Sequence, residues 1–277
     1  MFSKLKFFLV FSAFLSITPI SMAYEDVVFD LKELRSRGSI KFESTVKEEI
    51  GSFSNISNRV FKPKGAGTFP AVVLIHTCGG LRNDHIKEHA QLLLSKGFVV
   101  LVQDSFSPRG FDYCRPGNIF PGRVGTMDAY DALDHLHTLD FVDKNRIYEA
   151  GFSWGAVIAQ LLSSKSVAEK LEAKHRFNAT VSFYGTCFFN NRIFAPADAD
   201  QPVLMLIAGK DREQNLDGCV EYLQDIKTKG AKYEWYTYPE ASHGWDKKGE
   251  SRNGYFYDAD ITKNSIERMI EFFDKSK

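Results

Sequence analysis

The sequence places Ser153 between two glycines in the run Gly151-Phe-Ser-Trp-Gly155. A Gly-x-Ser-x-Gly pattern on a sharp turn from a strand into a helix holds the serine hydroxyl clear of the backbone. The first N–H groups of that helix and its dipole favour negative charge at the hydroxyl oxygen. Ser153 is therefore our candidate nucleophile, although the same five-residue pattern also occurs as an ordinary turn.

A serine nucleophile needs a base that takes its proton and an acid that orients the base. We predict His243 as the base, because it lies in a turn-rich loop after the last expected strand. Asp211 directly follows an apolar, strand-like run and is our candidate acid, ahead of Glu213 and Asp217 deeper in the next loop and helix. The other histidines fit helix packing, the surface or support of a turn: His76, His85, His89, His135, His137 and His175.

Attack on a carbonyl also creates an oxyanion that needs backbone N–H donors. Trp154, the residue after the nucleophile, supplies the first donor. The second is expected from a loop after an early strand, and we choose Cys78 in the glycine-containing turn at residues 76–80, with Thr77 behind it.

Alternating strands and helices position these residues. Apolar or β-branched runs predict strands at 71–76, 98–103, 146–150, 177–185, 203–209 and 233–238, with edge strands at 44–50 and 58–62. Helical spacing predicts helices at 84–96, 126–138, 153–164, 215–230 and 258–275, with a turn at 142–145 and a long loop at 104–123. This alternation implies an α/β fold with a mostly parallel central sheet covered by helices on both faces.

The composition is ordinary for a globular protein. The chain has 277 residues, 44% of them hydrophobic, with 35 basic and 35 acidic side chains. This balance gives no indication of nucleic acid or an anionic membrane surface as a partner. The chemistry expected at Ser153 requires no metal and no organic cofactor.

The first 23 residues have the pattern of a secretory signal peptide. Two early lysines precede an apolar run, and small residues precede a cleavage point near Ala23. A membrane anchor is the competing interpretation, but the apolar run is shorter than the roughly 20 residues that a spanning helix needs. We therefore expect a secreted or periplasmic protein in which residues 24–277 form one domain.

Several motifs in this order resemble those of the dienelactone hydrolase family of α/β-hydrolases. They are residues 73–81, 104–110, Arg123 with Asp128 and Asp131, 151–155, 209–211 and 239–244. The resemblance implies the α/β-hydrolase fold with little or no cap domain, and a triad of Ser153, Asp211 and His243. It also implies a difference, because the founding members of the family use a cysteine nucleophile.

The four cysteines are an even number, which in an exported protein favours disulfides over a zinc site. Their spacing does not fix the pairing. The resemblance to exported, serine-type members implies bonds between Cys78 and Cys114 and between Cys187 and Cys219.

Two further features of the loops bear on substrate binding. Arg109 pairs either with an acid on a helix or with a substrate carboxylate, and we favour the structural ion pair. Core packing explains most of the aromatic residues near the expected entrance, but several on loops indicate an apolar, uncharged pocket for the acyl or alcohol group. These aromatic residues are Phe106, Phe111, Tyr113, Trp154, Phe188, Phe189 and Trp245.

Together these observations predict an exported serine hydrolase that cleaves a small carboxylic ester or lactone through an acyl-Ser153 intermediate. A peptidase or an acyltransferase on the same scaffold is an alternative, because a triad does not choose the leaving group or the acceptor. A non-catalytic extracellular binding module is the alternative outside enzymes, and the complete Ser, Asp, His set argues against it. Nothing in the sequence indicates the oligomeric state.

Overall fold

A computed structural model describes residues 30–43, 45–50, 55–82, 84–114, 122–189, 192–249 and 254–277. The predicted signal peptide at 1–23 lies outside the described residues, as do residues 115–121 of the predicted loop at 104–123 and residue 44 of the predicted edge strand at 44–50. Within the described residues, no helix has the length and apolar character needed to cross a membrane.

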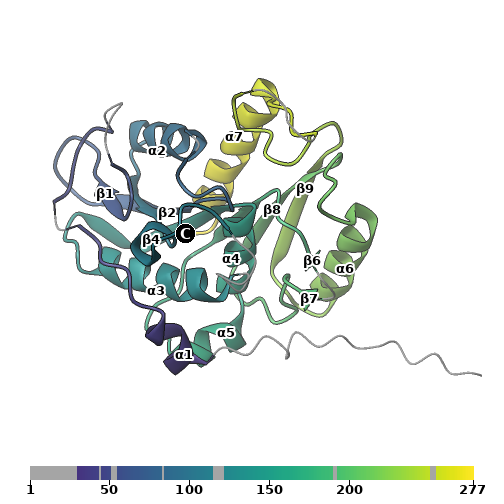
Figure 1. Cartoon of the computed structure of the whole chain (residues 1–277), viewed down its shortest axis with the longest axis horizontal. Coiled ribbons are helices and arrows are strands. Elements are labelled where there is room, and N and C mark those ends of the chain that lie inside the picture. The colour runs from purple at the N-terminus through teal and green to yellow at the C-terminus, as the bar shows by residue number, and fades with distance from the viewer. Residues whose placement is uncertain are drawn as a thin grey trace, which may run out of the picture.

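The centre of the fold is a seven-stranded sheet in the order β1-β3-β2-β4-β5-β8-β9 (Figure 1). Every neighbouring pair in this sheet is parallel except β1 with β3. The strands are β1 Arg59–Phe61, β2 Phe69–Ile75, β3 Val99–Gln103, β4 Val142–Phe152, β5 Thr180–Phe183, β8 Val203–Ala208 and β9 Tyr233–Tyr238. The strands β6 Phe188–Phe189 and β7 Arg192–Ile193 form a separate antiparallel pair.

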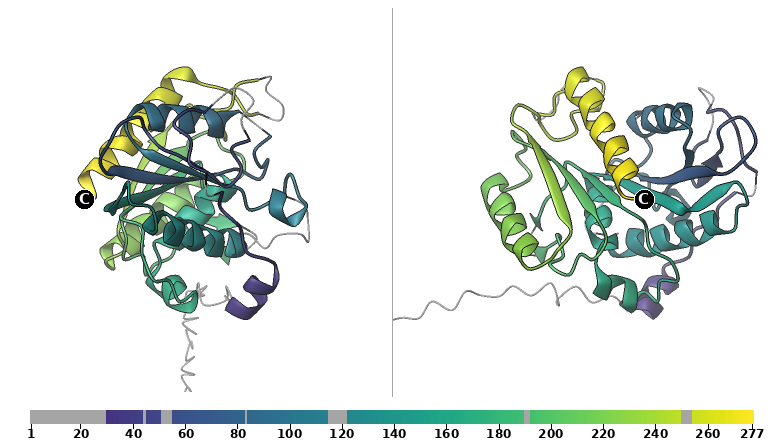
Figure 2. Two further views of the ribbon diagram at one scale, coloured as in Figure 1. Left: turned by 90° about the vertical axis from the view of Figure 1, so that its left-hand side faces the viewer. Right: turned by 180° about the vertical axis from the view of Figure 1, so that it is seen from behind.

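Helices cover both faces of the sheet, as Figure 2 shows from two further sides. Side chains alternate across each strand, so that Val72 and Leu74 of β2 pack in one core with α2 and α7, while Val73 and Ile75 pack in another with α3 and α4. The helices are α1 Leu31–Ser36, α2 His85–Ser95, α3 Arg123–His137, α4 Trp154–Leu162, α5 Lys165–Lys170, α6 Leu216–Thr228 and α7 Ala259–Lys275. This layered, mostly parallel architecture confirms the fold predicted from the sequence.

Three local predictions were wrong. The described residues 45–50 of the expected edge strand form no strand, because only Lys47 makes an isolated bridge to Phe61 of β1. The expected turn at 142–145 belongs to β4, because Val142 already pairs with Phe69. The register then shifts between Phe69 and Ala71, and this shift accommodates the polar residues 143–146 within the strand. The helix expected at 153–164 ends at Leu162, because the Ser164 side chain accepts a hydrogen bond from Val167 N and so begins α5. The sequence also gave no indication of α1, whose first turn is capped by Asp30.

One acidic side chain in the middle of the sheet has no compensating partner. Glu149 of β4 is fully buried, and neither of its carboxyl oxygens has a hydrogen-bond partner among the described residues. Burial raises the pKa of Glu149 well above 4.5, because the charged form loses its hydration without gaining a counter-charge. The Glu149 carboxyl therefore stays protonated at pH values at which an exposed glutamate is ionised.

We expect Glu149→Gln to stabilise the fold at alkaline pH. Above pH 4.5 the unfolded chain releases this proton while the folded chain retains it, so the wild type loses stability as pH rises. Glutamine has nearly the same shape and no such proton, so its effect on the free energy of unfolding should be more favourable at pH 8 than at pH 4, by about 1 kcal/mol or more. Urea unfolding at pH 4 and pH 8 tests this: equal effects of the substitution at both pH values would contradict it.

Candidate active site

Ser153 occupies a strained turn between β4 and α4. Its φ of 54° lies in the left-handed region, which costs a non-glycine residue about 1–3 kcal/mol. The turn is possible only with small neighbours. A Cβ atom on Gly151 would lie 2.0 Å from Gly155 O, and one on Gly155 would lie 2.4 Å from Ile75 O. The two glycines thus let α4 approach β2 and β4 closely enough to present the hydroxyl at the carboxyl end of the sheet.

The structure brings the three residues predicted as a triad together in one hydrogen-bonded chain. His243 Nε2 lies 2.8 Å from Ser153 Oγ, and His243 Nδ1 lies 2.7 Å from Asp211 Oδ2. The Asp211 and His243 side chains are only 2% and 9% exposed, so little water competes for these bonds. With the Nδ1 proton donated to Asp211, Nε2 is free to accept the proton of the serine hydroxyl.

Each member of this chain follows its own strand. Ser153 follows β4, Asp211 follows β8 and His243 follows β9. The loops after β8 and β9 are tied together, because Gly209 N donates to Tyr238 O and Lys210 N donates to Ala241 O, both at 2.8 Å. Asp211 and His243 therefore hold their relative position through the backbone as well as through their own hydrogen bond.

The two predicted oxyanion donors lie at the same end of the sheet. Trp154 is the first residue of α4, so its N–H has no acceptor one turn earlier in the helix. Cys78 lies in the turn closed by the hydrogen bond from Gly80 N to Thr77 O, 2.9 Å. Gly155 N donates to His76 O at 3.2 Å and joins this turn to the start of α4. Their role as donors stays a prediction.

His76 supports this turn from beneath. It is fully buried, its Nδ1 lies 2.7 Å from Thr77 O, and its Nε2 accepts a hydrogen bond from Ser105 N at 3.3 Å. Burial lowers the pKa of His76, so the ring is neutral with its proton on Nδ1. This arrangement matches the supporting role predicted for His76.

Both disulfides implied by the family resemblance are present, Cys78–Cys114 and Cys187–Cys219. The first fixes the turn of the predicted donor Cys78 to the loop after β3, and Cys114 N donates to Cys78 O in the same place, 2.8 Å. The second joins the segment after β5 to α6, the helix that follows the loop of Asp211. Each bond therefore ties a loop of the candidate site to a neighbouring segment.

Two groups of residues around His243 were not predicted in these roles. Glu213 Oε2 lies 3.7 Å from His243 Nε2, and the Tyr255 hydroxyl donates to the Glu213 carboxylate. Beneath the imidazole, the Tyr184 ring lies edge-on at 4.9 Å between centroids, and its hydroxyl donates to Asp246 at 2.8 Å. The sequence signal for Glu213 was its place two residues after Asp211, whereas Tyr184 and Asp246 gave no signal at all.

His89, expected only to pack in a helix, completes the buried group. Its Nε2 lies 2.8 Å from Asp246 Oδ2, and the Asp246 side chain is fully buried. Burial alone would raise the pKa of Asp246. Its hydrogen bonds to His89 and Tyr184 and the charge interaction with the neighbouring histidines instead hold this pKa below its usual range. Asp246 is thus a fixed anion between α2 and the loop of His243.

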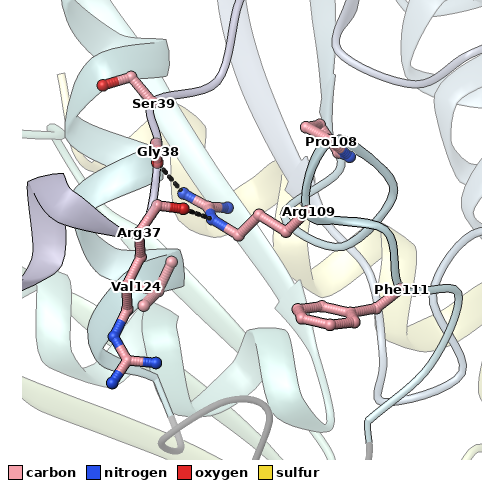
Figure 3. Close-up of a pocket in the computed structure, with 7 residues that line it drawn as sticks. All are labelled: Arg37, Gly38, Ser39, Pro108, Arg109, Phe111 and Val124. Carbon is pink, nitrogen blue, oxygen red and sulfur yellow. Dashed lines mark hydrogen bonds between the residues drawn. The ribbon is translucent and has the colours of Figure 1, made fainter.

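Arg109 forms the structural ion pair that the sequence favoured. Its guanidinium makes two hydrogen bonds of 2.8 Å to the buried Asp128 carboxylate of α3. Figure 3 shows the same guanidinium reaching the carbonyl oxygens of Arg37 and Gly38. A pocket of about 310 Å³ adjoins it, lined by Arg37, Gly38, Ser39, Pro108, Arg109, Phe111 and Val124. No triad residue lines this pocket.

Several of the aromatic residues near the expected entrance pack in the core, as expected from the sequence for most of them. Phe106 and Trp245 are fully buried in the two cores, and Trp154 is 6% exposed and stacks on His76. These rings therefore support the site rather than line a substrate pocket. Phe111, Tyr113 and Phe188 are half-buried.

The described residues contain no group of three or more histidine, cysteine or acidic side chains arranged to hold a metal ion.

Comparisons with known proteins agree with this architecture. A protein of Salmonella typhi named "Putative carboxymethylenebutenolidase" is 24% identical over 228 residues, which cover 76% of this chain and 80% of that protein. Among solved structures, the dienelactone hydrolase-like promiscuous phosphotriesterase P91 from metagenomic libraries shares 20% identity with a TM-score of 0.58, covering 76% of this chain and 88% of P91. Butyrate-bound esterase 2 of Thermogutta terrifontis shares 15% identity with a TM-score of 0.57, covering 78% and 87%.

The family itself is identified by a longer match. Residues 56–276 match the dienelactone hydrolase family, and this range contains the strand-to-helix turn, the acid and the histidine described above. The chain therefore belongs to the dienelactone hydrolase family and is a hydrolase with the α/β-hydrolase fold.

Proposed function

We propose that this protein hydrolyses a small carboxylic ester or lactone by nucleophilic catalysis at Ser153. The observation that carries the proposal is the continuous chain from Ser153 Oγ through the His243 imidazole to the buried Asp211 carboxylate. A binding module has no need of such a chain. The curated relative named as a carboxymethylenebutenolidase and the butyrate-bound esterase support ester or lactone chemistry over peptide cleavage.

In the first half of the reaction, His243 Nε2 takes the Ser153 proton while Oγ bonds to the carbonyl carbon. The Trp154 and Cys78 N–H groups stabilise the oxyanion. Collapse of this intermediate breaks the bond to the leaving oxygen, which receives the proton from Nε2, and leaves an acyl group on Ser153. In the second half, Nε2 takes a proton from water, the resulting hydroxide attacks the acyl carbon, and the acid product leaves as Oγ recovers its proton. Asp211 stabilises the imidazolium in both halves.

We also propose that the protein is exported and that residues 24–277 form a single domain after removal of residues 1–23. The signal-like composition of residues 1–23 and the two disulfides support export, because such bonds persist in oxidising compartments. Family membership and fold are independent of this proposal.

Labelling with a fluorophosphonate tests the proposed nucleophile. The probe should modify the wild type at Ser153, identified by mass spectrometry of the tryptic peptide, because activated serines attack phosphorus as they attack a carbonyl. The similarly folded esterase 2 of Thermogutta terrifontis has been solved phosphorylated by paraoxon. Labelling should disappear in Ser153→Ala and fall sharply in His243→Ala. A folded wild type that takes up no probe, or a probe attached to another residue, would refute the proposal.

A further inference from the structure

Two carboxylates of one loop face opposite nitrogens of the same imidazole. Asp211 holds Nδ1 of His243, while Glu213 Oε2 lies 3.7 Å from Nε2, the nitrogen that also contacts Ser153 Oγ. The Asp211 side chain is 2% exposed and the Glu213 side chain 50% exposed. Glu213 is therefore an anion at the entrance of the site, on the side of His243 where protons are exchanged with the substrate.

Glu213 is held there by a tyrosine rather than by a cation. The Tyr255 hydroxyl donates to its carboxylate, and the Tyr255 ring lies 5.5 Å from the His243 ring between centroids. The segment of Tyr255 is itself anchored, because Phe256 N donates to Ser242 Oγ at 2.7 Å. Among the described residues, no lysine or arginine forms an ion pair with Glu213. Its negative charge is thus available to a ligand.

The reaction geometry places the alcohol part of an ester beside this charge. His243 Nε2 gives its proton to the leaving oxygen, which must come within hydrogen-bond distance of about 3 Å. Since Glu213 Oε2 is 3.7 Å from Nε2, the leaving oxygen lies within about 7 Å of the carboxylate in any such pose. A charged group a few bonds further along the alcohol can therefore reach Glu213.

The other charges around the site do not cancel Glu213. Lys247 is on the same side, where burial lowers its pKa and the charges of Asp246 and Glu213 oppose that effect. Arg212, which lies between Asp211 and Glu213 in the chain, is exposed and packs beside Gly254, and among the described residues it forms no ion pair with Glu213. The cation Arg82 belongs to the opposite side, because its Nε donates to Gly79 O in the turn of Cys78 at 3.1 Å.

We propose that Glu213 and Tyr255 form a subsite for the alcohol part of the substrate that favours a positively charged alcohol over a negatively charged one. A carboxylate beside an aromatic ring is the combination that binds organic ammonium groups, through charge attraction and the face of the ring. The subsite rests on the proposed function, since only a hydrolase acting through His243 places the alcohol here. The acyl part of the substrate is not constrained by it.

Three esters with one short, uncharged acyl group test this subsite. Their alcohol parts carry a trimethylammonium group, its uncharged tert-butyl isostere, or a carboxylate at the same distance from the ester oxygen. For the wild type we expect kcat/KM to fall in that order, by about tenfold between the first and the last at low salt, because Glu213 is partly screened by water. The ratio should shrink at high salt.

The variants separate charge from shape. Glu213→Gln keeps an acceptor for the Tyr255 hydroxyl but removes the charge, so the cation-to-anion ratio should fall to about twofold or less. Glu240→Gln is the matched control, because its carboxylate faces Lys210 on the neighbouring turn, and it should keep the wild-type ratio. An unchanged ratio in Glu213→Gln, or a wild type that hydrolyses all three esters equally, would overturn the subsite alone. Hydrolysis of none of the esters and no fluorophosphonate labelling would instead refute the proposed function.

Discussion

Ser153→Ala should lower kcat for ester hydrolysis by about 10⁵-fold or more, which is the expected loss when a triad nucleophile is removed. The alanine keeps the turn and the predicted donors of Trp154 and Cys78, so only the weak activity due to binding and oxyanion stabilisation should remain. The measurement is the initial rate on an uncharged activated ester, with the melting temperature measured on the same sample.

An exposed serine at the end of α2 provides the control. Ser95→Ala removes a hydroxyl that donates only to Leu92 O in its own helix and should leave kcat within about twofold of the wild type, as do most surface substitutions away from a site. If Ser153→Ala keeps a tenth or more of the wild-type kcat while folded, then Ser153 is not the nucleophile.

Asp211→Asn should lower kcat by about 10⁴-fold with little change in stability. The amide NH₂ faces His243 Nδ1 and favours the tautomer with the proton on Nε2, which cannot accept the proton of Ser153. Fluorophosphonate labelling should slow in parallel, because it requires the same proton transfer. Steady-state rates and labelling rates across pH 6–10 would measure both effects.

The matched variant is Asp217→Asn, because Asp217 was an alternative candidate for the acid of the triad in the sequence. Asp217 lies in the exposed first turn of α6, so its loss should change kcat by less than about threefold. A larger loss in Asp217→Asn than in Asp211→Asn would reverse our assignment of the acid, and similar small losses would show that His243 needs no carboxylate.

Much of the fold was predictable because its signals are local. The buried strands β2, β3 and β8 are continuous apolar runs, and glycines or polar turns mark where the helices between them begin and end. The boundaries failed where a tertiary contact overrides the local pattern. At Val142, pairing with Phe69 extends β4 through polar residues that by themselves predict a turn.

The site was predictable to the extent that its residues follow strand ends. Ser153, Asp211 and His243 follow strands whose carboxyl ends meet at one edge of the sheet, so the Gly-x-Ser-x-Gly pattern and the order along the chain could select them. Tyr184 and Asp246 could not be found in this way. Their importance depends on a contact between them across the core, and a buried tyrosine or aspartate has no sequence pattern that distinguishes it from ordinary packing. The role of Glu213 depends equally on the orientation of one side chain.

The separation of the three loops has a consequence for how the protein folds. Ser153 and His243 are 90 residues apart in the chain, and the sheet between them is built from parallel strands joined by long crossovers. Parallel strands pair slowly, because the chain loses the entropy of a long loop before the contacts between the strands stabilise it. Helix α4 forms locally, whereas the complete site exists only after β8 and β9 have docked. During refolding, we therefore expect hydrolytic activity to return with the last strands and to lag behind the recovery of helix content.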